Sequence, residues 1–150
     1  MSRPEPAELG RRLDAVLDAA ERMIRAVPEA EMSAPVPGGD GSLRDVAFRL
    51  FRLALAFADG MDLGRFPEDW RHEAAPDDLR DGAAVARYGA LVRGRLAGWF
   101  EGAAPREFAR VIAVYDGPQP GHALLERIAA DAASHLRLLE VALERVGRAR

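Results

Sequence analysis

An aspartate and a histidine four residues apart, Asp131 and His135, are the first side chains in this sequence whose types and spacing could do chemistry. Four residues is slightly more than one helical turn, so in a helix both side chains lie on one face. A carboxylate and an imidazole at this spacing can share a metal ion or a proton. A lone histidine on an apolar helix face is more often a hydrogen-bonded part of the core, so both interpretations stay open.

The residue types that are missing restrict the chemistry further. All 21 basic residues are arginine, and the sequence contains no cysteine. A Schiff-base lysine and a thiolate nucleophile are therefore excluded. No G-x-S-x-G motif is present to expose a nucleophilic serine. A net charge of -3, without a basic stripe interleaved with aromatic residues, argues against a nucleic-acid partner.

Length and composition indicate an ordinary globular domain. The 150 residues are enough for one domain with a substantial core, and 49% of them are apolar. No apolar run is long enough to span a bilayer, so no membrane association is expected. The first ten residues lack the basic and then apolar pattern of a signal peptide. Without cysteine nothing argues for export or disulfides, and we expect a cytoplasmic location.

Four segments carry the apolar periodicity of helices, and Asp131 and His135 lie in the last of them. Pro28 ends the first segment, and Ser42 followed by Asp45 is typical of a helix start. The near absence of a strand signal predicts an all-α, four-helix bundle in a single domain, residues 1–150. The four predicted helices cover about residues 5–27, 42–59, 82–101 and 121–147.

The connections between these helices are long. Residues 61–80 show no steady period, and we expect them to place Phe66 and Trp70 against the bundle. His72 and Glu73 lie in the same connection, where we expect the histidine to face solvent. Residues 108–115 contain β-branched side chains and predict a short extended piece.

Three stretches of the chain together resemble the DinB-like proteins. They are SLRDVAFRLFRLALAFADG, RYGALVRGRLAGWF and YDGPQPGHALLERIAADAASHLRLLE. The resemblance covers most of residues 8–147, and it is strongest to the branch with the motifs S-x-R-D-L-x-x-H-x-F-R and L-L-E-R-x-x-W-H-x-x-x-H-x-R-Q-L. It implies a four-helix bundle, in many relatives a homodimer. It also implies a divalent metal bound by three histidines, which some relatives use to activate a low-molecular-weight thiol.

The motif positions that carry the metal in the family are changed here. The histidine of the second helix falls on Arg49, the first histidine of the fourth helix falls on Asp131, and only His135 matches. A guanidinium stays protonated in proteins and repels cations. The resemblance therefore implies a degenerate, vestigial site. We predict an ion pair between Arg49 and Asp131, with His135 hydrogen-bonded beside it.

Three functions follow from this site. The first is a metal-free DinB-like domain without catalytic residues or cofactor, which binds a ligand or a partner. The second is a thiol transferase or isomerase whose zinc or nickel ion is held by Asp131, His135 and a third ligand such as His72 or Glu73. The third is metal-free catalysis with His135 as base and Asp131 as the residue that orients it.

A homodimer is expected from the family resemblance and from the third predicted helix. Ala90, Gly94 and Gly98 follow one another at intervals of four residues, so a neighbouring helix can approach closely along that face.

Overall fold

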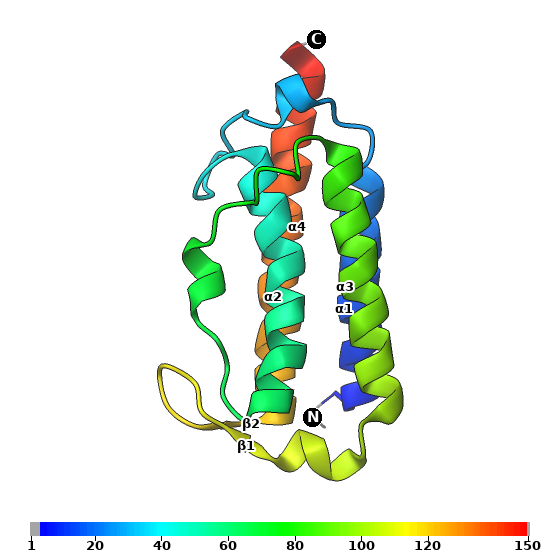
Figure 1. Ribbon diagram of the computed structural model, residues 1–150, viewed down its shortest axis with the longest axis vertical. Helices are drawn as coiled ribbons and strands as arrows, with labels where there is room; N and C mark the ends of the chain where they lie inside the picture. Colours follow the sequence, from blue (N-terminus) through cyan, green and yellow to red (C-terminus); the bar gives the residue numbers. More distant parts are fainter. Residues whose placement is uncertain (1–3, 150) are drawn as a thin grey trace.

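The computed structural model describes residues 4–149 and consists of four long helices packed side by side (Figure 1). This confirms the prediction of an all-α, four-helix bundle. The helices are α1 (Pro6–Ile24), α2 (Leu43–Leu63), α3 (Gly82–Gly102) and α4 (Gly121–Ala149). Three short 3₁₀ turns and two strands lie in the connections: η1 (Glu29–Glu31), η2 (Asp69–His72), η3 (Pro105–Ala109), β1 (Val111–Ile112) and β2 (Gln119–Pro120).

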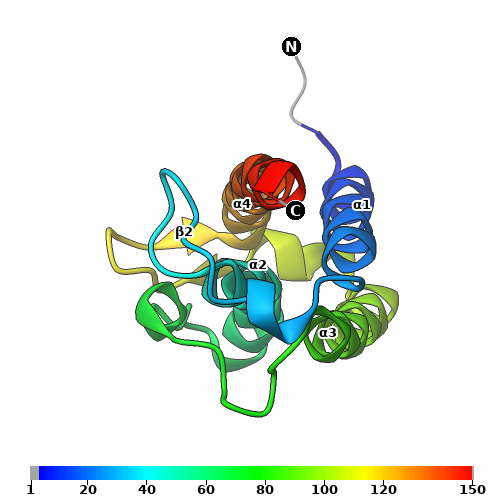
Figure 2. The same cartoon turned by 90° about the horizontal axis from the view of Figure 1, so that it is seen from above.

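The helices pack in a ring that does not follow the chain order. Seen along the bundle, α1 and α2 lie on opposite corners, and each packs against both α3 and α4 (Figure 2). The connection that carries η2 runs along the outside of α2 (Figure 1). The segments that flank α2 can therefore contact its side chains directly.

The core forms from the apolar stripes that the periodicity indicates. In α1, Leu13, Leu17 and Ile24 are completely buried, as are Phe51 and Phe57 of α2. Burial of one such side chain contributes roughly 1.5–3 kcal/mol. Phe66 and Trp70 of the long connection are also buried in this core, as predicted.

Helix α2 begins as predicted and ends later than predicted. The Ser42 hydroxyl accepts a hydrogen bond from the Asp45 N–H at 3.2 Å and caps the first turn. The prediction that the helix ends before Gly60 is wrong, because the helix continues to Leu63 and stops at Gly64, whose φ is +80°. Gly60 lies inside the helix, where a Cβ atom would approach the Phe66 backbone to 3.2 Å.

The glycines of α3 lie in two different environments. The close helix approach occurs at Gly89, where a Cβ atom would lie 2.6 Å from the Phe51 ring of α2. At Gly94 and Gly98 no heavy atom lies within 4 Å of such a Cβ, so that face meets no other helix in residues 4–149.

The connection before α4 contains the short extended piece expected there. Strands β1 and β2 pair in antiparallel fashion, with Val111 opposite Pro120. Phe108, at the start of the predicted segment, belongs instead to η3. The backbone N–H of Phe66 donates to the carbonyl of Ala113 at 2.8 Å, which attaches the long connection to this hairpin. Throughout the described chain, every helix is too short or too polar to cross a membrane.

Candidate functional site

Arg49 is buried near the N-terminal end of α2, with 8% of its surface exposed. Its Nε–H donates to the carbonyl of Glu73 at 3.0 Å, and its Nη1 donates to the carbonyl of Asp40. An arginine at the edge of a core stripe usually extends to solvent, but this side chain is buried. The guanidinium instead joins α2 to both connections that flank it.

Two side chains in the first turn of α2, Arg44 and Asp45, bind the connection between α2 and α3. The Asp45 carboxylate accepts from the N–H of Ala75 at 3.0 Å and from the Ser42 hydroxyl at 3.1 Å. Arg44 donates to the carbonyl of Ala75 at 3.2 Å. Burial alone would raise the pKa of Asp45, but the hydrogen bonds from Ala75 and Ser42 and the charge of Arg49 outweigh it and lower the pKa.

The two loop residues considered as a third metal ligand are engaged or exposed. The Glu73 carboxylate accepts from Nε of Arg52 at 2.9 Å. His72 lies in η2 and is exposed, as predicted. Among the described residues, neither side chain forms a metal-binding group with Asp131 and His135.

His135 is half-buried on α4 and makes its hydrogen bond within the helix. Its Nδ1 lies 2.8 Å from the backbone carbonyl of Asp131, not from the carboxylate. Because a carbonyl oxygen only accepts, Nδ1 is the donor of this hydrogen bond. The ring of Trp70 packs against His135, with the centroids 6.2 Å apart.

The predicted ion pair between Arg49 and Asp131 is wrong. Among residues 4–149, no hydrogen bond or ion pair joins the two side chains, and the Asp131 carboxylate has no such partner. The physical reason is that carbonyl groups of two connections already satisfy the Arg49 guanidinium. The sequence gives no signal for these acceptors, since every residue carries a carbonyl group.

These residues do not fit a metal ion. A three-ligand site needs lone-pair donors that converge, and only His135 and Asp131 supply them. The position that the sequence resemblance assigns to the third ligand carries Arg49, whose guanidinium has no lone pair to donate. Within the described residues, no three histidine or acidic side chains are grouped so that they could hold a metal.

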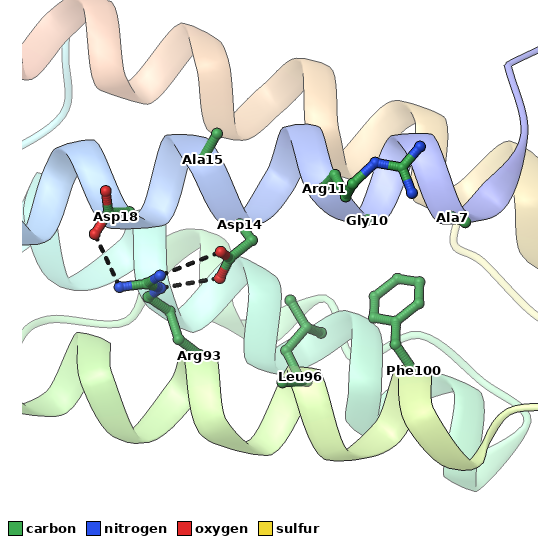
Figure 3. Close-up of a pocket in the computed structure, with 10 residues that line it drawn as sticks. Ala7, Gly10, Arg11, Asp14, Ala15, Asp18, Arg93, Leu96 and Phe100 are labelled. Atoms are coloured by element: carbon green, nitrogen blue, oxygen red, sulfur yellow. Dashed lines mark hydrogen bonds and ion pairs between the residues drawn. The ribbon is translucent and has the colours of Figure 1, made fainter.

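A separate groove lies between α1 and α3 (Figure 3). Its charged end contains Arg93 of α3, which donates to both oxygens of Asp14, at 2.9 and 3.1 Å, and to Asp18 and Glu21 at 3.0 Å each. The hydrogen bonds to Asp14 are the largest cause of a raised Arg93 pKa. This cluster was not predicted, although the acidic residues at positions 14, 18 and 21 share one helix face.

Comparison of the fold gives the class of protein: the chain has the four-helix-bundle fold of the DinB-like proteins. It is similar to the DinB-like protein YjoA of Bacillus subtilis, with a TM-score of 0.73 and 13% identity over 93% of this chain and 92% of that one. It is also similar to YfiT of Bacillus subtilis, described as a probable metal-dependent hydrolase with an unusual four-helix bundle topology. Here the TM-score is 0.74 and the identity 14%, over 97% and 94% of the two chains. No family model and no curated protein sequence matches the chain.

Proposed function

We propose that this protein is a DinB-like bundle that has lost its metal site and serves a non-catalytic role in binding a ligand or a partner. The observation that carries the proposal is the environment of Arg49. A permanently charged, buried guanidinium occupies the position of a family metal ligand, and two backbone carbonyls hold it there. Metal binding would require Arg49 to leave both acceptors and carry its charge away from the site.

The alternative is an enzyme that depends on a divalent metal. YfiT is described as a probable metal-dependent hydrolase, and thiol transferase or isomerase chemistry is the activity implied by the sequence resemblance. In this alternative, Asp131 and His135 would hold zinc or nickel with a third ligand. The ion pair of Glu73 with Arg52 and the exposed position of His72 both count against it.

Metal loading distinguishes the two functions. Protein purified without chelator is incubated with zinc or nickel chloride and desalted, and the bound metal is measured by elemental analysis. We expect well under one equivalent per chain and an unchanged melting temperature. One bound equivalent that disappears in His135→Ala, or metal-dependent turnover of a thiol adduct, would establish the alternative. Glu140→Ala is a suitable control, because Glu140 is exposed and lies more than one turn beyond His135 on α4.

We also propose that the protein forms a homodimer and is located in the cytoplasm. The face of α3 that carries Ala90, Gly94 and Gly98 is exposed, and a Cβ atom at either glycine would meet nothing within 4 Å. Leu91, beside this face, has 74% of its surface exposed. These features support the approach of a helix from a second copy. The lack of cysteine supports the location.

A further inference from the structure

The groove between α1 and α3 presents an apolar surface to solvent. Its volume is about 570 Å³, and small-molecule sites commonly enclose roughly 300–1,000 Å³. The side chains of Leu96 and Phe100 extend from α3 toward α1 (Figure 3). Small alanine side chains of both helices complete the apolar lining: Ala7, Ala15 and Ala97. The groove shares no residue with the cluster around Arg49.

Gly10 explains why an aromatic ring can line this groove. A Cβ atom at this position of α1 would lie 3.0 Å from the Phe100 ring, so glycine lets the ring lie against the helix without a shift. Phe100 is half-buried and stacks on Phe108, with centroids 6.0 Å apart. A second hollow of about 470 Å³ is lined by Ala7, Phe100 and Phe108. The apolar surface therefore continues past Phe100 toward η3.

Most charged side chains at the border of the groove are already engaged in ion pairs. Arg93 binds both oxygens of Asp14 and one oxygen of Asp18. Arg22 also pairs with Asp18 at 2.8 Å, and Arg25 pairs with Glu21 at 3.0 Å, so three guanidiniums match the three carboxylates of this cluster. Arg11 also lines the groove, and its guanidinium extends along α1 toward Ala7 (Figure 3). Arg11 forms no hydrogen bond or ion pair with any described residue. The charge that remains available to a ligand is positive.

We propose that this groove binds a small amphipathic monocarboxylate, an aryl or alkyl acid. Its apolar body packs on Phe100 and on the exposed side chains of Ala15 and Ala97, and its carboxylate accepts hydrogen bonds from Arg11. A cationic ligand fits less well, because Arg93 already occupies the Asp14 and Asp18 carboxylates. This inference rests on the binding role proposed above, and it names the ligand. The groove contains none of the residues of the vestigial metal site. A negative result in the ligand-binding experiment would therefore leave the metal-loading result unaffected.

Octanoate is a suitable probe, and octanol is its uncharged counterpart. With about ten non-hydrogen atoms, octanoate is expected to bind with a dissociation constant of about millimolar, which ¹H–¹⁵N NMR titration can measure. We expect shifts in the N-terminal half of α1 and the C-terminal half of α3. Arg11→Gln should weaken octanoate binding about fivefold and leave octanol binding unchanged. Arg12→Gln is the matched control, because Arg12 pairs with Glu8 at 2.6 Å and does not line the groove.

Two further variants test the location. Ala15→Phe and Ala97→Phe replace exposed side chains on the two sides of the groove, so each should fold normally and block both probes. No octanoate shift, or shifts outside this groove, would overturn the proposal. Equal octanoate affinity in wild type and Arg11→Gln would overturn the assignment of the carboxylate to Arg11. Persistent binding in both filled variants would place the ligand elsewhere.

Discussion

Replacement of Arg49 by alanine tests whether its guanidinium holds the two connections onto α2. The side chain donates two charge-assisted hydrogen bonds, and each such bond is worth about 1.5–3 kcal/mol. Two effects reduce the net loss: Asp40 is exposed, so water can replace one bond, and a buried cation is removed. We therefore expect Arg49→Ala to lower the free energy of unfolding by about 2–3 kcal/mol. For 150 residues this lowers the melting temperature by about 4–12 °C.

Thermal unfolding followed by circular dichroism measures this loss. Arg87→Ala is the matched control, because Arg87 is exposed on α3 and contacts no charged partner among the described residues; its effect should stay within about 0.5 kcal/mol. Asp131→Ala should also be nearly neutral, and the double variant Arg49→Ala/Asp131→Ala should show no coupling. If Arg49→Ala is as stable as Arg87→Ala, the guanidinium does not hold the connections. A coupling energy above about 0.5 kcal/mol between the two substitutions would instead be evidence that Arg49 and Asp131 form an ion pair.

Three more predictions concern glycine substitutions in α3, the pH dependence of stability at Asp45, and the oligomeric state. Gly89→Ala should destabilise the protein by about 1–3 kcal/mol in urea unfolding, because the added Cβ meets the Phe51 ring, whereas Gly94→Ala should stabilise it by about 0.5–1 kcal/mol. Asp45→Asn should cost about 1 kcal/mol at pH 7. Because the folded-state pKa of Asp45 is lowered, this contribution is present above the ordinary value of 3.8 and is lost as pH falls through the folded pKa, so the two proteins should converge in acid. Sedimentation should give twice 16.3 kDa, and Gly94→Leu should return the monomer mass; a wild-type mass of one chain would exclude the dimer.

The helical framework could be predicted from the sequence because helix period and capping are local properties. Ser42 and Asp45 mark the start of α2 within a few residues of chain, and the structure has that cap. The end of α2 was missed because a glycine often ends a helix. Gly60 serves a contact with Phe66 instead, and that contact depends on how the connection folds back.

The partners of the candidate site could not be predicted, because they lie on connections without a period. Helical spacing predicts on which face of α2 Arg49 lies. It does not predict the two acceptors of the guanidinium, which are the backbone carbonyls of Asp40 and Glu73. The ring of Trp70 was expected on the bundle, yet nothing in the sequence placed it against His135. Periodicity places a side chain on a face and leaves open which loop atoms reach it.

Under the proposed loss of the metal site, the environment of Arg49 accounts for a fold that needs no metal ion. A metal ion at this position would join helices by accepting lone pairs, whereas a guanidinium joins segments by donating hydrogen bonds. Arg49 finds acceptors in backbone carbonyls, which any loop sequence supplies, so the change does not require a new acidic residue. Asp131 need not pair with it, and its half-buried carboxylate can be hydrated. In the proposed metal-free protein, the connections on either side of α2 therefore supply the partners of Arg49, and α4 supplies none.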